Sequence, residues 1–438
     1  MTTSFAVKNE RKNNLRLKNS PLLIVIYISV CAFVIYSSMY GFRKPYTVGE
    51  YGTLHFFGIS YKVCLVIAQV LGYMCSKFLG IRFISSMKPE NRLKYILLFI
   101  GIAWLALLLF ALIPAPLNIL CMFINGLPLG MVFGLVFGFL EGRKTTEIMG
   151  AILVTSFIFA AGVAKSLGKW LLLDCNINGN WMPFVAGAFF IIPLLVAVGL
   201  LQFAPAPNQE DIALRTVRNP MTATERKAFI RTFGFTLIPV VLSYAIFTIT
   251  RDFCEDFVNE LWAETGFKNN ASIFTQSSSI ISCIVLVVIA VFFLIKNNLL
   301  AFRLTHFLVM IGISISAIST FLFNANFIGP FSWILFAISG LYLAYLPFNC
   351  LYFERMLALH KIKGNVGFVM YIADAFGYLG TVSVLLIKEF IPLQYNWVNF
   401  FSFLFYTAAI LGLLLMVLTL KLHNNLILKL WKKEQPLL

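Results

Sequence analysis

The sequence predicts an all-α membrane protein with twelve transmembrane helices in two pseudo-symmetric six-helix halves. Three observations support this fold class. The chain of 438 residues is 60% apolar and only 12% charged, whereas soluble proteins average about 25% charged residues. Twelve apolar segments are long enough to cross about 30 Å of hydrocarbon. Matched residues also recur after about half of the chain, which indicates two homologous halves.

The twelve apolar segments are expected to be helices, because lipid offers no hydrogen-bond partner to an open backbone. They lie near residues 21–45, 57–80, 95–113, 117–140, 148–170, 183–204, 232–257, 272–295, 304–325, 331–353, 366–389 and 398–420. The longest polar stretch separates the sixth segment from the seventh. The expected organisation is a cytoplasmic basic N-terminus (1–20), an N-terminal six-helix half (21–204), a cytoplasmic central loop (205–231), a C-terminal six-helix half (232–420) and a cytoplasmic basic tail (421–438).

The loops predict the orientation of the bundle. The termini and loops on one side carry 25 Lys and Arg residues, whereas the opposite loops carry only Lys169, Lys268 and Lys388. Lys and Arg concentrate in cytoplasmic loops, so we expect both termini in the cytoplasm. The expected location is a bacterial inner (plasma) membrane. This placement explains the net charge of +16 without a nucleic-acid partner.

The sequence does not predict an enzyme. Its eight cysteines are scattered without a C-x-x-C pair, and its four histidines are far apart, so we expect no metal and no cofactor. No nucleophile–base set is visible in the sequence. The phosphate-binding loop G-x-x-x-x-G-K-[ST] is also missing, which argues against ATP-driven pumping.

Two matched sets of three residues stand out within the apolar segments. The first set is Tyr36, Tyr40 and Arg43, and the second, 208 residues further on, is Tyr244, Thr248 and Arg251. Spacings of four and three residues place each set on one helical face. Gln69 with Gln276, and Gly126 with Gly340, are matched at similar offsets. We therefore expect two halves related by an axis along the membrane normal, with the two faces opposed across a central cavity.

Charged residues within the expected spans are the strongest functional signal. A charge at the bilayer centre costs about 2.5–3.5 kcal/mol on insertion scales. Such a residue is therefore retained only where it has an ion-pair partner, contact with water or a function. These residues are Arg43, Lys44, Lys62, Lys77, Lys165, Arg251, Asp252, Glu255, Asp256 and Asp374. The third, sixth, ninth and twelfth segments carry no charge, which predicts that they form a lipid-facing outer shell.

This organisation resembles the major facilitator superfamily. Three short motifs resemble its organophosphate:phosphate antiporter branch: Arg43-Lys44 in the first helix, Ser76-Lys77-Phe78 in the second, and Arg251 in the seventh. The resemblance implies that the two arginines bind phosphate and that Lys77 supports them. The acids that follow Arg251 depart from the pattern of the branch and could neutralise this arginine.

The candidate residues fall into two groups. The expected solute-binding residues are Tyr36, Tyr40, Arg43, Lys44, Lys77, Tyr244, Thr248 and Arg251. The expected coupling or gating residues are Lys62, Gln69, Lys165, Asp252, Glu255 and Asp374. Helices 2 and 11 meet in the superfamily, so the resemblance implies an ion pair of Asp374 with Lys77 or Lys62 that forms in one conformation. The alternatives are a static pair and a proton-carrying Asp374, and the arginines could instead be interfacial cations.

The predicted function is secondary active transport by alternating access. Six intramembrane cations exceed the acids, which favours an anionic organic solute such as a phosphate ester or a carboxylate. We expect a small-molecule solute, a proton or phosphate as coupling ion, the lipid bilayer as surroundings, and a monomer. Two alternatives remain open. One is a non-transporting membrane sensor or scaffold, and the other is a proton-coupled transporter of another solute that uses Asp374.

Overall fold

The computed structural model describes residues 21–434, apart from 53, 57, 86, 88, 142, 144, 206–222, 360–365 and 391–395. Of the predicted regions, 1–20, most of the central loop and the last residues of the tail therefore lie outside the described residues. The first half contains α2 (Pro21–Gly41), α3 (Tyr61–Ser85), α4 (Arg92–Leu112), α5 (Ile119–Leu140), α6 (Thr146–Leu173) and α7 (Met182–Leu201). The second contains α9 (Ala223–Trp262), α10 (Ile273–Phe293), α11 (Asn298–Asn324), α12 (Pro330–Pro347), α14 (Val366–Phe390) and α15 (Trp397–Glu434).

These twelve long helices confirm the predicted all-α class. Within the described residues, eleven are long and apolar enough to cross a membrane, and α14 adds a further helix of 25 residues. The chain is thus an integral, multi-pass membrane protein. Short elements complete the fold: η2 (Pro45–Val48), the antiparallel hairpin of β1 (His55–Phe56) and β2 (Ile59–Ser60), η3 (Pro89–Asn91), η4 (Ala263–Phe267), η5 (Phe348–Tyr352) and α13 (Phe353–Leu359).

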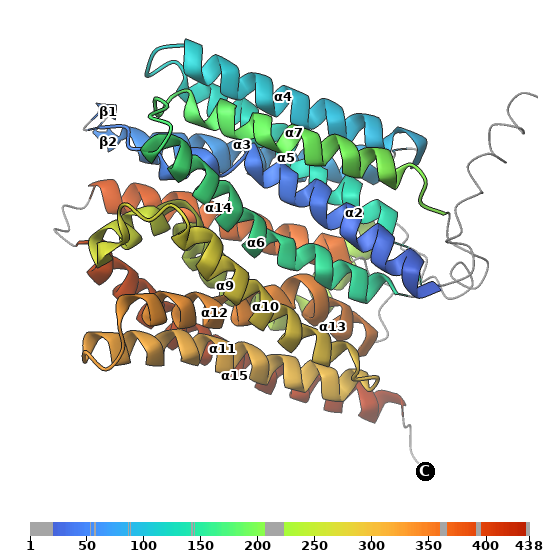
Figure 1. The fold of residues 1–438 in the computed structure, drawn as a ribbon. Coiled ribbons are helices and arrows are strands. Elements are labelled where there is room, and N and C mark those ends of the chain that lie inside the picture. The colour runs from blue at the N-terminus through green and yellow to red at the C-terminus, as the bar shows by residue number, and fades with distance from the viewer. Residues whose placement is uncertain are drawn as a thin grey trace, which may run out of the picture.

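The helices form one bundle with the charged helices inside. Figure 1 shows α4 and α7 along one edge and α11 and α15 along the opposite edge. In their spans 39%, 33%, 44% and 33% of residues are buried, against 78% for α12 and 72% for α6. These four helices thus lie at the edges of the bundle, although α2, also with 44% of its span buried, is no more buried than α11. Helix α10 is also largely exposed, with 22% of its span buried, which the charge pattern did not predict.

The two halves meet along pairs of inner helices. Helix α6 packs against α10, α3 packs against α14, and η2 contacts α9. The start of α2 and the end of α15 lie at the same end of the bundle, and the β1–β2 hairpin lies at the other (Figure 1). We call this second end the hairpin end. The predicted site residues lie on α3, α6, α9 and α14, and on α2 with the turn that follows it, so the site lies at the junction of the halves.

Several helix ends differ from the sequence-based boundaries, among them those of α2, α9 and α15. Helix α2 ends at Gly41 rather than near residue 45, because Pro45 lacks an N–H group and opens η2. Arg43 therefore follows the helix instead of sharing the helical face of Tyr36 and Tyr40. Helix α9 begins at Ala223, within the predicted loop, and α15 continues to Glu434, within the predicted tail. Hydropathy detects the apolar part of a helix and not its polar extensions.

Candidate solute-binding site between the two halves

Arg43 is a buried cation without an acidic partner. Its side chain is only 6% exposed, and its guanidinium lies over the Tyr73 ring of α3, 4.0 Å from the ring centroid. The Tyr40 ring lies 5.8 Å from the same group. The Nε atom of Arg43 is buried without a hydrogen-bond partner, and within the described residues no carboxylate lies close enough to pair with the side chain. Such a group is poised to bind an anion.

A buried amide network fixes the backbone that carries Arg43. The Gln69 side chain donates from Nε2 to the Arg43 carbonyl oxygen at 3.1 Å and to Asn125 Oδ1 at 2.8 Å. Asn125 in turn donates to the carbonyl oxygens of Phe42 and Ala103, at 3.0 Å each. This network ties the turn after α2 to α3, α4 and α5. Gln69 therefore positions the backbone of Arg43. This contact is a physical basis for the predicted gating role of Gln69, which stays a prediction.

Arg251, the counterpart of Arg43 in the second half, is neutralised. It forms an ion pair with Asp252 through Nη2, and Nε donates to the same Oδ1 atom at 3.1 Å. Its Nη1 donates to the Tyr345 hydroxyl at 2.8 Å, and the Tyr345 ring lies 4.6 Å from the guanidinium. Asp252 is held from its other oxygen by the Thr381 hydroxyl at 2.8 Å. The two arginines thus differ in charge environment although their sequence positions match.

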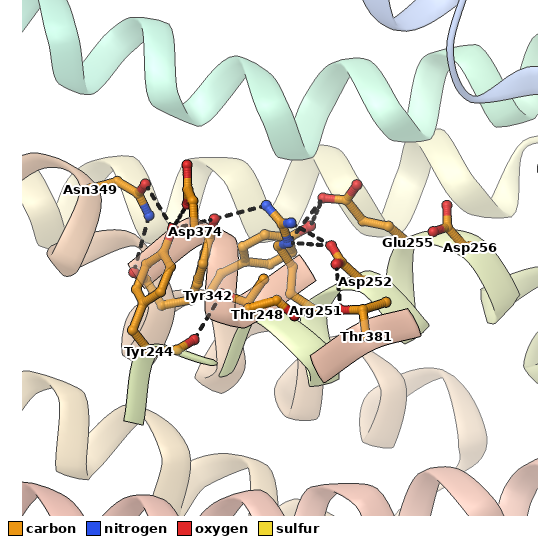
Figure 2. A network of polar contacts seen from close by, with 12 residues as sticks. Tyr244, Thr248, Arg251, Asp252, Glu255, Asp256, Tyr342, Asn349, Asp374 and Thr381 are labelled. Carbon is orange, nitrogen blue, oxygen red and sulfur yellow. Dashed lines mark hydrogen bonds and ion pairs between the residues drawn. The ribbon is translucent and has the colours of Figure 1, made fainter. Parts of the chain in front are cut away.

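Figure 2 shows Arg251 with Asp252 and Glu255 on one side and a tyrosine cluster with Asp374 on the other. The Tyr244 hydroxyl donates to Asp374 Oδ1 at 2.6 Å and lies 3.2 Å from the Tyr345 hydroxyl. Lys77 Nζ lies 3.6 Å from Asp374 Oδ2, so the ion pair between α3 and α14 is present. A chain of contacts through Tyr345, Tyr244 and Asp374 thus connects Arg251 with Lys77 of the other half.

Lys44 contacts the second half, as an ion-pair partner and not as an open solute ligand. Its Nζ lies 3.0 Å from Glu255 Oε2 and 2.5 Å from Asp256 Oδ1, and the side chain is 1% exposed. Glu255 also accepts a hydrogen bond from the Tyr342 hydroxyl at 3.2 Å. These contacts bind the turn after α2 to α9 and join the halves.

Further polar contacts join the halves at the hairpin end. Lys62 forms an ion pair with Glu260 and donates to the Thr47 carbonyl oxygen at 2.5 Å, so it does not pair with Asp374. The backbone N–H of Ser60 donates to Glu389 Oε2 at 2.7 Å. These contacts, together with those of Lys44, hold the two halves together at this end of the bundle.

The remaining predicted residues have varied surroundings. Tyr36 is buried among aromatic rings of its own half, including Phe133 and Phe157. The Thr248 hydroxyl donates to the Tyr244 carbonyl oxygen at 2.8 Å, so its proton is already used. The Tyr40 ring lies 5.8 Å from the Arg43 guanidinium and packs edge-on against the Tyr36 ring. Tyr40 therefore belongs to the aromatic surroundings of Arg43.

Several site residues were not assigned from the sequence. They are Tyr342, Tyr345, Thr381 and Glu260. Tyr73 shares a helical face with Gln69 and Lys77, four residues away on either side, and this spacing marks it in the sequence as part of the same polar lining. Tyr345 had no comparable signal, because its role depends on where Arg251 points. Among the described residues, no group of three or more potential metal ligands is present.

After pairing, the site has a net positive charge. Five acids form ion pairs with the intramembrane cations: Asp252, Glu255, Asp256, Glu260 and Asp374. Of the six intramembrane cations, Arg43 and Lys165 have neither an ion pair nor a side-chain hydrogen bond among the described residues. Six cations against these five acids leave an excess of one positive charge. An additional anion would balance it.

Comparison with solved structures defines the class of fold. A D-xylose–proton symporter superposes with a TM-score of 0.59 and 14% identity, over 91% of this chain and 97% of the symporter chain. A nucleoside transporter gives 0.58 and 14%, over 91% and 99%. A peptide transporter in complex with sulfate gives 0.61 and 14%, over 91% and 94%. The fold is therefore that of the major facilitator transporters.

The family follows from the sequence itself. The profile of DUF5690, a family of unknown function, matches residues 45–425, which is most of the chain. The protein belongs to this family. A comparison with curated proteins returns no match.

Proposed function

We propose that the protein is a secondary active transporter that binds a small organic anion at Arg43 and moves it by alternating access. The observation that carries this proposal is the state of Arg43: buried, placed at the junction of the two halves, and without an acidic partner in the part of the chain that the structure describes. A buried charge without a partner is retained where it has a task. Binding an anion that is then released on the other side is such a task.

The chemistry of Arg43 favours a phosphate ester or a carboxylate. A guanidinium presents parallel N–H groups that match these anions bidentately, and its planar face can stack on an aromatic ring, as it does on Tyr73. The tyrosine hydroxyls around it can complete the shell of the anion. This assignment agrees with the motif resemblance to the organophosphate:phosphate antiporter branch. Exchange for phosphate or another anion is the coupling we propose.

Asp374 favours a second form of coupling. It lies between Lys77 of the first half and Tyr244 of the second, within hydrogen-bond distance of the latter. A carboxylate in this position can bind a proton when Lys77 moves away, so proton coupling is the second candidate.

We further propose that the protein is a monomer in a bacterial inner membrane. Both termini are then cytoplasmic, because the loop charges favour this topology. The proposed boundaries of the two halves are those stated above.

Uptake into proteoliposomes tests the proposal. The purified protein is assayed with a panel of labelled sugar phosphates, short carboxylates, sugars and nucleosides. We expect uptake of an organic anion by the wild type and a loss of at least about tenfold in Arg43→Ala, because a charge-assisted contact contributes about 1.5–3 kcal/mol. Arg303→Ala is the matched control, since Arg303 is an exposed guanidinium on the outer helix α11.

Two outcomes would contradict the proposal. Unchanged uptake by Arg43→Ala would overturn the binding role of Arg43. No uptake of any solute by a correctly folded wild type would favour the alternative of a membrane sensor or scaffold. Size-exclusion profiles of each variant distinguish a lost site from a misfolded protein.

A further inference from the structure

A second candidate site lies around Lys165, in a cavity between helices of both halves. The cavity has a volume of about 50 Å³ and is bounded by α6 of the first half and by α9, α10 and α12 of the second. Its polar lining residues are Lys165, Cys254, Glu255, Ser277, Ser278 and Tyr342. The other lining side chains are apolar or aromatic, apart from Gly162. The cavity is therefore small, largely apolar and marked by one cation.

Lys165 lines this cavity as a buried cation without a partner. It lies in α6 and is 4% exposed. In the described part of the chain, no carboxylate forms an ion pair with its Nζ atom and no acceptor forms a hydrogen bond with it. Burying an unpaired ammonium is costly, so a partner from outside the chain would lower the free energy of this arrangement.

The neighbouring polar groups are not partners of Lys165, because they pair or hydrogen bond with other groups. Glu255 is paired with Lys44 at 3.0 Å and accepts from Tyr342 at 3.2 Å. The hydroxyls of Ser277 and Ser278 donate to backbone carbonyl oxygens of their own helix, at 2.8 and 2.6 Å. The charge of Lys165 thus remains uncompensated at the cavity wall.

We propose that this cavity binds a small monovalent anion, a halide or a short carboxylate, at Lys165 Nζ. One water molecule needs about 10–15 Å³ of cavity volume, so this cavity of about 50 Å³ has room for a small anion but not for a large solute. An ammonium among apolar walls, with Glu255 nearby, cannot replace the hydration of a dianion such as sulfate. Arg43 is not among the residues that line this cavity, and the inference does not depend on the transport proposal.

Occupancy of this site would stabilise the present arrangement of the halves. The cavity wall comes from α6 on one side and from α9, α10 and α12 on the other. An anion between them binds only when the halves are in this position, and a ligand shifts an equilibrium toward the state that it binds more tightly.

Thermal unfolding of the purified full-length protein tests the inference. Sodium gluconate is replaced by sodium chloride, or by sodium acetate, at constant ionic strength. We expect chloride or acetate to raise the midpoint temperature by about 2 °C or more at saturation, with a saturable concentration dependence. Lys165→Met should abolish this rise. Lys169→Met is the matched control, because Lys169 lies on the same helix but is paired with Glu50 at 3.6 Å.

The two anions identify the ligand. A response to chloride alone assigns a halide site, and a response to acetate assigns a site for short carboxylates. The inference is overturned if Lys165→Met responds like the wild type, if neither anion raises the midpoint, or if sulfate at equal ionic strength raises it as much as chloride. Ala161→Leu provides a second variant that narrows the cavity but keeps the charge, and it should also lose the response. Neither result bears on the role of Arg43.

Discussion

At the scale of single residues, Arg43 and Arg251 occupy matched sequence positions but have different surroundings. Arg43 stacks on Tyr73 without an acid, whereas Arg251 is held by Asp252 and Tyr345. A guanidinium saturated by a carboxylate attracts an anion less than an open one does. The asymmetry begins at one position, where Lys44 of the first half corresponds to Asp252 of the second. In the proposed site the first half would thus supply the anion ligand, whereas the arginine of the second half is already paired with a carboxylate.

Asp252→Asn tests this asymmetry. The change removes the carboxylate that neutralises Arg251, so we expect the transported anion to bind about tenfold tighter, since a new charge-assisted contact contributes about 1.5–3 kcal/mol. The midpoint of thermal unfolding should fall, because removing one partner of a buried ion pair costs about 3–5 kcal/mol. Ligand-binding titration and thermal unfolding of the same preparation measure the two opposite effects.

Thr381→Ala is the control for Asp252→Asn. It removes the 2.8 Å hydrogen bond to Asp252 but leaves the negative charge in place. We expect a modest loss of stability, of about 1 kcal/mol, and an unchanged anion affinity. An unchanged or weaker affinity in Asp252→Asn would show that Arg251 is not accessible to the anion.

Sequence alone could identify the charged residues of the site but not their partners. Arg43, Lys44 and Arg251 stood out because charges within apolar segments are rare. Their pairing depends on side-chain directions and on which helices touch, and neither is a property of the local sequence. Lys44 was expected among the solute ligands, yet it contacts Glu255 and Asp256. Lys44 can reach these two acids only because α9 packs beside η2.

At the scale of helices, the pair of α3 and α14 is the best candidate for a moving contact. Lys77 and Asp374 join these helices across the two halves at 3.6 Å, with side chains that are 18% and 12% exposed. Partial exposure lowers the cost of separating the two charges compared with a fully buried pair. A contact of this kind can break and reform during a transport cycle.

Exchange of the two charges tests this contact. We expect Lys77→Asp and Asp374→Lys each to lose at least about tenfold in uptake rate, since each places like charges side by side. The double variant Lys77→Asp with Asp374→Lys should recover part of the rate. Recovery is partial because Tyr244 then loses its acceptor at Asp374. Lys77→Asp combined with Glu260→Lys is the mismatched control and should not recover, and equal rates in both doubles would refute a specific pair.

Helix number and class could be predicted from hydropathy, whereas helix neighbours could not. Gly126 and Gly340 are matched in sequence, but a Cβ on Gly126 would meet the Gln69 carbonyl oxygen of α3 at 2.2 Å, and one on Gly340 would meet the Gly312 carbonyl oxygen of α11 at 2.4 Å. Both glycines permit close helix approach, to partners that are not symmetry-related. Gln276 likewise is exposed, whereas Gln69 is buried. Matched residue types therefore predict the repeat but not equivalent environments.

At the scale of the whole molecule, ion pairs hold the two halves together at the hairpin end. Lys44 contributes most directly, because it contacts two acids of α9 and is almost fully buried. Lys62 with Glu260 adds a contact of the same polarity, with the cation on the first half and the acid on the second. The proposed alternating access requires this end to open, so in that cycle these pairs would break.

Lys44→Met should open the hairpin end. The variant leaves Glu255 and Asp256 buried beside each other without their shared cation, which costs about 3–5 kcal/mol and favours separation of the halves. Cys254 reports the change, since it is 4% exposed next to Glu255. With Cys254 as the remaining cysteine, we expect a thiol reagent to label it at least about tenfold faster in Lys44→Met than in the parent, since each 1.4 kcal/mol is a factor of ten.

Lys169→Met is the control for this labelling experiment. Lys169 is a buried cation of α6 paired with Glu50, a residue of its own half, so its loss leaves the junction of the halves intact. We expect the labelling rate of Cys254 to stay close to that of the parent. Equal acceleration in both variants would indicate general loosening of the fold, and no acceleration in Lys44→Met would show that apolar packing of α6 on α10 holds this end closed without the ion pairs.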